Sequence, residues 1–190
     1  AAIGDAARLI RSNEADIAVC GGTEACMNIV SLGGFAAARS LSTGFNDTPS
    51  KASRPFDTAR DGFVMGEGAG ILVIEALSHA LARGATPIAE LVGYGTTADA
   101  HHITSGPEDG SGARRAMQIA IAQAGIAPHE IGHLNAHATS TPVGDLGELR
   151  AIKSLFGQKK SVAVSGTKSA TGDLLGAAGG LGAIFTILAL

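Results

Sequence analysis

The sequence has few charged residues, few aromatic residues and no tryptophan. Charged side chains make up 16% of the 190 residues, and the aromatic residues are six phenylalanines and one tyrosine. The net charge is −3, and Lys and Arg are scattered rather than arranged in the basic stripe that neutralises a phosphate backbone. The negative net charge and the lack of a basic stripe argue against a nucleic-acid partner.

Cysteine is scarce too. Cys20 and Cys26 fit neither a metal-ligand spacing nor a disulfide framework, which favours a reduced compartment such as the cytoplasm or an organelle matrix. No metal or cofactor site is predicted. Residues 174–190 carry no charge, but this stretch is slightly short for a bilayer span and holds four glycines. It predicts a buried helix in close contact with its neighbours, not a membrane partner.

Hydrophobic residues and glycine are plentiful. Hydrophobic residues make up 45% of the chain, and 27 glycines allow tight backbone packing. A helical pattern begins at Ala1, and an apolar run continues to Leu190 with no stop signal. We therefore expect an internal piece of a longer protein, with a core-rich fold or a large subunit interface.

Apolar periodicity predicts strands that alternate with helices, which indicates an α/β fold with a sheet covered on both faces. The first strand, 17–20, is expected to be buried on both faces. Residues 42–62, with two prolines and many polar side chains, predict an extended loop. The other predicted strands are 70–75, 88–95, 133–135 and 162–165, and the predicted helices lie near 3–10, 77–83, 113–124 and 145–156, with a final glycine-rich helix.

Two segments place reactive side chains directly after short apolar strands. They read Asn-Ala-His-Ala-Thr-Ser-Thr-Pro at 135–142 and Ser-Gly-Thr-Lys-Ser-Ala-Thr-Gly-Asp at 165–173. Ligands of α/β sheets gather beyond the carboxyl ends of strands, so both segments are candidate site loops. The alternatives are that His137 is a core histidine satisfied by backbone groups and that Lys168 is a solvated surface lysine.

These motifs resemble those of the β-ketoacyl-acyl-carrier-protein synthases, most closely the elongating type, synthase I/II. Further agreement covers essentially the whole chain: Gly-Gly-Thr-Glu at 21–24, Arg-Ser-Leu-Ser at 39–42, Arg-Pro-Phe-Asp at 54–57, Arg-Asp-Gly-Phe-Val-Met-Gly-Glu-Gly at 60–68 and Gly-Asp at 144–145. Several blocks in one order make chance convergence very improbable, whereas any single block would be weak.

The resemblance implies a thiolase-like fold, a layered α-β-α-β-α architecture with a mixed sheet and buried helices. Residues 1–75 would be the end of its N-terminal half, and 76–190 most of its C-terminal half. It implies a homodimer that takes acyl and malonyl groups from acyl carrier protein in fatty acid biosynthesis, without a cofactor. The acylated nucleophile would be a cysteine upstream of Ala1, which leaves Cys20 and Cys26 as small buried hydrophobes.

The resemblance also assigns roles. His137 would donate a hydrogen bond to the malonyl thioester carbonyl as carbon dioxide leaves, and Lys168 would organise the site electrostatically. Thr139 and Thr141 would bind the pantetheine arm, and Phe35 would line the acyl pocket, unless it is an ordinary core residue. Asp99 and His102 would support the active site.

One position departs from the family pattern: Asp173 stands where the family carries its second catalytic histidine, in Thr-Gly-Asp-Leu-Leu-Gly-Ala-Ala-Gly at 171–179. An ionised carboxylate only accepts hydrogen bonds and would repel a malonyl carboxylate. Asp173 could also cap the final helix, with Lys168 as a possible ion partner. We expect both to hold, so that the residue is tolerated by the fold but damages catalysis. Three hypotheses stay open: an elongating synthase, a non-catalytic partner like a chain-length factor, and an inactive relative or fragment. A thiolase is a further enzyme alternative, against which the Lys168 loop argues.

Overall fold

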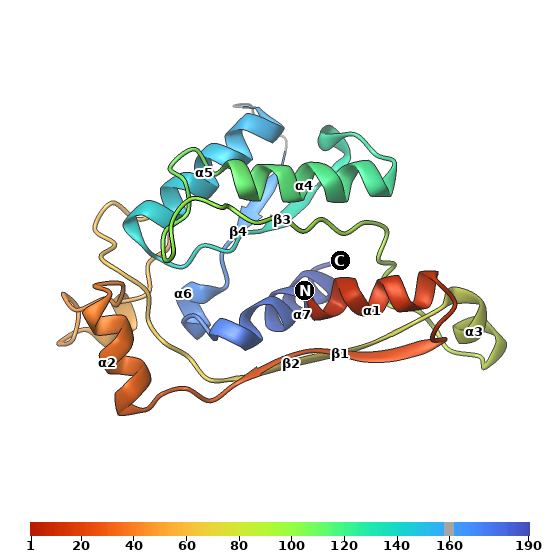
Figure 1. The fold of residues 1–190 in the computed structure, drawn as a ribbon, viewed down its shortest axis with the longest axis horizontal. Coiled ribbons are helices and arrows are strands. Elements are labelled where there is room, and N and C mark those ends of the chain that lie inside the picture. The colour runs from red at the N-terminus through yellow and green to blue at the C-terminus, as the bar shows by residue number, and fades with distance from the viewer. Residues whose placement is uncertain (158–161) are drawn as a thin grey trace.

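The computed structural model describes residues 1–157 and 162–190. Its helices and strands lie in layers (Figure 1), with α4 and α5 on one side, the short β3–β4 pair next, then α1, α6 and α7, and the long β1–β2 pair on the far side. The helices are α1 (Ala2–Arg11), α2 (Ile29–Ala37), α3 (Leu77–Ala82), α4 (Ser111–Ala124), α5 (Pro142–Phe156), α6 (Lys168–Thr171) and α7 (Ala178–Leu188). The predicted layered α/β architecture is confirmed.

The strands form two pairs of opposite type. β1 (Ile17–Glu24) is antiparallel to β2 (Gly68–Glu75), and β3 (His133–Asn135) is parallel to β4 (Ala163–Ser165). α7 packs on the inner face of β1–β2, where a methyl group added at Gly180 would collide with the carbonyl oxygen of Gly70. Glycine at both positions therefore permits the close helix–sheet contact predicted for this segment.

The outer face of β1–β2 corrects one prediction. Residues 17–20 were expected to be buried on both faces, yet Ile17 and Val19 are exposed, as are Ile71 and Val73 on the neighbouring strand. Val19 pairs directly with Val73, and side chains alternate along each strand. Only the face that carries Cys20 and Leu72 meets helices, so the sheet is covered on one side by the described residues.

The predicted strand at 88–95 is also wrong. This stretch forms no strand ladder, and its backbone groups bond to side chains of neighbouring helices: Leu91 accepts from Arg11 at 3.1 Å, and Tyr94 donates to Gln123 at 3.0 Å. An apolar run becomes a strand only when another strand lies beside it. None does so in the described parts of the chain.

The remaining elements match the sequence closely. Gly125 closes α4 in a left-handed conformation, as expected, and α5 begins at Pro142, three residues before the predicted start. The loop at 42–62 contains one short 3-10 turn, Pro49–Lys51, and two more turns, Pro128–Glu130 and Leu175–Ala177, precede β3 and α7. No helix is predicted at 29–37, yet α2 forms there, and the Asn28 side chain caps it by accepting from the amides of Val30 and Ser31.

Candidate active site

The β3–β4 pair brings the two candidate loops together. Because the strands are parallel and in register from His133 to Asn135, both chains leave the sheet at the same edge. One more hydrogen bond, from the amide of Ala136 to the carbonyl of Ser165, extends the pairing into the loops at 2.8 Å. The residues that follow, His137 and Lys168, therefore meet, as their position after neighbouring strands predicts.

Lys168 is buried, with 8% of its surface exposed, so the alternative of a solvated lysine is wrong. Its ammonium nitrogen donates to the carbonyl oxygen of His137 at 2.6 Å and lies 3.5 Å from His137 Nδ1. Burial lowers the pKa of Lys168, and the negative charges of Asp173, Glu148 and Asp145 oppose this shift. The site thus holds a desolvated amine against the histidine loop.

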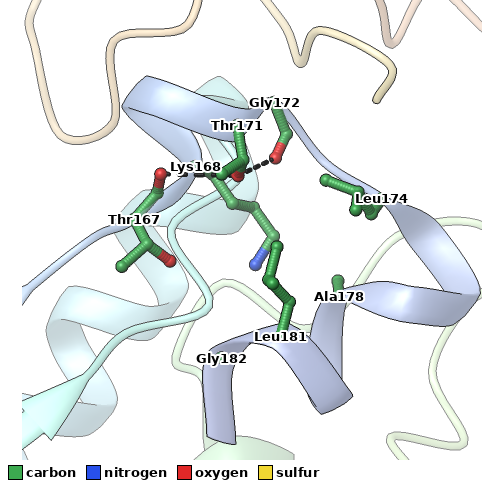
Figure 2. A pocket seen from close by; sticks show the side chains of 8 residues that line it. All are labelled: Thr167, Lys168, Thr171, Gly172, Leu174, Ala178, Leu181 and Gly182. Carbon is green, nitrogen blue, oxygen red and sulfur yellow. Dashed lines mark hydrogen bonds between the residues drawn. The ribbon is translucent and has the colours of Figure 1, made fainter. Parts of the chain in front are cut away.

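Figure 2 shows Lys168 together with Thr171, Leu174 and Leu181 among the residues that line a cavity of about 10 Å³. The hydroxyl of Thr171 donates to the Gly172 carbonyl at 2.8 Å. Leu174 and Leu181 line the same cavity, so the surroundings of Lys168 are partly apolar.

His137 has an exposed side chain, so it is not a core histidine. It lines an open hollow of about 280 Å³ between the strand ends and α7, together with Asn135, Thr167, Lys168 and residues of α7. An imidazole and a buried ammonium on one wall can both stabilise negative charge that develops on a bound carbonyl oxygen. The hollow is therefore the candidate active site.

The backbone of the His137 loop is strained and held by carboxylates. Ala138 and Ser140 are fully buried and have positive φ angles of 41° and 73°. Glu148 accepts from the amides of His137 and Ala138 at 2.6 and 2.7 Å, and Asp145 accepts from the amide of Ser140 at 3.1 Å. Such residues persist only where their surroundings fix them. Glu148 is not among the predicted site residues, because it lies in α5 with no local motif to mark it.

Thr139 and Thr141 lie in the same loop, and their hydroxyl oxygens are 3.0 Å apart. Each hydroxyl can donate one hydrogen bond and accept others, so the pair keeps capacity for an amide-containing ligand. Their role in binding pantetheine stays a prediction.

Asp173 is buried, with 7% of its surface exposed, and its backbone forms a parallel bridge with Met65. One carboxylate oxygen accepts from the amide of Leu175, the first residue of the 3-10 turn before α7, at 3.0 Å. The prediction that Asp173 caps the final helix is wrong, because Ala177 stands at the N-cap of α7. The ion pairs of the described residues do not include one between Asp173 and Lys168, so their interaction is a longer-range attraction. Asp173 thus fills a structural position while it places a negative charge near the site.

Three other predicted site residues are not among those that line the hollow. The Phe35 ring packs edge-on against buried Phe63, with centroids 5.1 Å apart. Asp99 and His102 are exposed on the long loop before α4, where His102 Nδ1 accepts from the amide of Thr104 at 3.2 Å. Within the described residues, neither bonds to His137 or Lys168. Their roles, like the acyl-pocket role of Phe35, stay predictions.

Neither cysteine belongs to the hollow. Cys20 is buried in β1, and burial raises the pKa of its thiol. Desolvation, followed by the negative charges of Glu24 and Glu67, raises the pKa of Cys26. Both thiols therefore stay protonated and poorly nucleophilic at neutral pH. Clusters of metal-binding side chains are absent from 1–157 and 162–190, and no helix in these ranges is long and apolar enough to cross a membrane.

Comparison with known proteins tests the predicted family. Residues 1–80 match the beta-ketoacyl synthase N-terminal domain, and residues 88–190 match its C-terminal domain. The chain is 55% identical to the mitochondrial 3-oxoacyl-[acyl-carrier-protein] synthase of Arabidopsis thaliana, over 99% of this chain and 41% of that protein. It is 56% identical to 3-oxoacyl-[acyl-carrier-protein] synthase 2 of Staphylococcus aureus, over 99% of this chain and 46% of that one.

A solved structure of a type II PKS acyl-carrier protein in complex with its ketosynthase superimposes with a TM-score of 0.95 at 37% identity, covering 98% of this chain and 46% of the other. The chain thus spans less than half the length of these relatives. Matches to both domains of one family, in order, together with a shared fold, settle the assignment. The chain belongs to the β-ketoacyl synthase family.

Proposed function

We propose that the protein to which this chain belongs is a 3-oxoacyl-[acyl-carrier-protein] synthase that elongates fatty acids. The observation that carries the proposal is the buried Lys168 ammonium, 2.6 Å from the His137 carbonyl oxygen, at the ends of two adjacent parallel strands. The two synthases at 55% and 56% identity support the same reaction.

In this reaction a cysteine upstream of Ala1 holds the acyl chain as a thioester. His137 donates a hydrogen bond to the thioester carbonyl of malonyl-carrier protein, which stabilises the enolate as the carbon–carboxylate bond breaks and carbon dioxide leaves. The carbanion attacks the acyl carbon, a carbon–carbon bond forms, and the cysteine leaves as thiolate. Lys168 supplies a fixed positive charge, and the Thr139 and Thr141 hydroxyls bind the pantetheine amides.

The same proposal includes the partners of the protein and its location in the cell. The protein takes both substrates from acyl carrier protein and acts as a homodimer. In each subunit, residues 1–75 form the end of the N-terminal half of the fold, and residues 76–190 form most of the C-terminal half. A ketosynthase of the same fold has been solved with its acyl-carrier protein, which supports this partner. We place the protein in the cytoplasm, or in an organelle matrix if it is eukaryotic; one relative is mitochondrial.

One observation favours a second function. The Asp173 carboxylate cannot donate to a carbonyl and would repel the malonyl carboxylate. A protein with this site could serve as a non-catalytic partner subunit, like a chain-length factor.

The test is mass spectrometry of the full-length protein after incubation with acyl-carrier protein loaded with an acyl group. A covalent acyl adduct, followed by 3-oxoacyl product when malonyl-carrier protein is added, is the expected result. If the protein takes up no acyl group under conditions where the carrier protein acylates a known synthase, the enzyme proposal fails and the partner-subunit function is favoured.

A further inference from the structure

The segment before β2 contacts both candidate loops. The Ser53 hydroxyl donates to the Lys168 carbonyl at 2.5 Å, and the amide of Arg54 donates to the Ser140 hydroxyl at 3.0 Å. The amide of Phe56 donates to the carboxylate of Asp145 at 2.7 Å. These residues are more than 80 positions away in sequence from the loops they hold. The geometry of the site therefore depends on this segment.

The Arg60 side chain reaches the junction between the His137 loop and α5. Its Nε donates to the carbonyl of Thr141 at 3.1 Å, and its Nη2 donates to that of Pro142 at 2.6 Å. Its Nη1 donates to the carbonyl of Asp57 at 2.9 Å, which fixes the guanidinium to its own segment. The side chain is 16% exposed, so these bonds form largely away from water.

The charge of Arg60 is compensated locally. Asp145, with its side chain 1% exposed, lies 3.4 Å from Arg60 Nε. A cation at the N-terminus of a helix opposes the helix dipole, and Arg60 lies at the start of α5. Its presence there is favourable because it neutralises the buried Asp145, and its fork donates to two carbonyls at once. The Thr141 carbonyl also accepts from the amide of Asp145 at 3.2 Å, so Arg60 adds a second bond to it. A lysine could supply the charge, but it could not span both carbonyls with a rigid fork.

We propose that Arg60 is a positioning residue for substrate binding: by holding the carbonyls of Thr141 and Pro142, it sets the Thr139 and Thr141 hydroxyls for the pantetheine arm. This rests on the proposed function of the site. Arg60 is not among the residues that line the hollow, so it acts through the loop at 137–142. Its loss should weaken carrier-protein binding more than it slows the chemical step.

The experiment compares Arg60→Met, Arg60→Lys and a control, Arg115→Met, in the full-length protein. Arg115 is exposed and bonds only to the carbonyl of Ala98 among the interactions described. The readouts are KM and kcat with malonyl-carrier protein, and amide hydrogen exchange over residues 137–145 and over α4. Arg60→Met should raise KM about tenfold, which corresponds to about 1.4 kcal/mol, with kcat changed by less than about threefold.

Amide exchange over 137–145 should accelerate in Arg60→Met while α4 stays protected, and Arg60→Lys should show a smaller rise in both KM and exchange. Arg115→Met should match the wild type. The proposal is overturned if Arg60→Met lowers kcat with KM unchanged, if exchange at 137–145 is unaltered, or if Arg60→Lys equals the wild type. Should Arg60→Met fail to fold, Arg60→Lys decides. If the wild-type protein forms no condensation product, the proposed function fails, yet hydrogen exchange still tests the positioning role.

Discussion

The loop around His137 buries polar groups, whereas the outer face of the β1–β2 pair exposes apolar ones. Asp145 and Ser140 are almost fully buried, and hydrogen bonds from within the chain satisfy them. On the sheet, Val19 and Val73 pair with each other and are 73% and 60% exposed. The site loop is thus held by contacts inside these 190 residues, while the sheet face presents a contiguous apolar surface of the kind that marks an interface.

The first prediction tests this contrast directly. Asp145→Ala should lower the free energy of unfolding by about 3–5 kcal/mol, because it leaves Arg60 and two backbone amides without their buried partner. Val73→Ala, a truncation on the exposed sheet face, should cost about 1 kcal/mol or less. Urea denaturation of the 190-residue chain measures both. Equal costs would contradict the contrast.

The same pair of variants in the longer protein sharpens the comparison. If other parts of that protein cover the β1–β2 face, the cost of Val73→Ala should rise to about 1–2.5 kcal/mol, the range for buried methyl groups. The cost of Asp145→Ala should stay the same, because its partners all lie in this chain.

The second prediction concerns Asp173. In the full-length protein, Asp173→His should raise the condensation rate by about 10²-fold or more, the effect of one hydrogen-bond donor on a developing oxyanion. Rates with malonyl-carrier protein measure it. Asp173→Asn is the control, since it removes the negative charge without adding an imidazole and should give a smaller gain. An unchanged rate in Asp173→His would refute the view that this residue limits catalysis.

The third and smallest effect is the pH dependence set by Lys168. Burial lowers the pKa of Lys168, so between this lowered pKa and the ordinary lysine range the unfolded chain binds more protons than the folded one. The free energy of unfolding should therefore rise with pH across that window. Lys168→Met removes the titrating group from both states and should flatten the profile. Denaturation at a series of alkaline pH values measures the free energy of unfolding of the wild type and of Lys168→Met. If the two free energies change in parallel with pH, the prediction is wrong.

Local sequence signals predicted the site well where strand and loop are adjacent in sequence. The apolar runs before His137 and Lys168 placed both at strand ends, and the structure confirms that they meet. The signals could not identify Glu148 or Arg60 as supports of this loop. Glu148 lies one helix turn after Asp145 with no motif of its own, and Arg60 reaches its acceptors across 81 and 82 residues.

The two errors in the fold have a common physical cause. Residues 88–95 and the outer face of residues 17–20 were assigned from their apolar character, which shows that a segment tends to be buried but not what buries it. Leu91 and Tyr94 bond to side chains from α1 and α4, and Val19 has no covering layer among the described residues. Strand pairing is a property of two segments, so one segment cannot specify it.

The sequence by itself determined the α/β alternation, the two reactive loops and the departure at Asp173, because each depends only on residues that are neighbours in sequence. The tertiary structure alone decided that the Lys168 amine is buried against the His137 carbonyl, and that Asp145, Glu148 and Arg60 hold the strained loop in place. These features depend on distances between segments far apart in the chain. Such distances are fixed only when burial and hydrogen bonding are satisfied together.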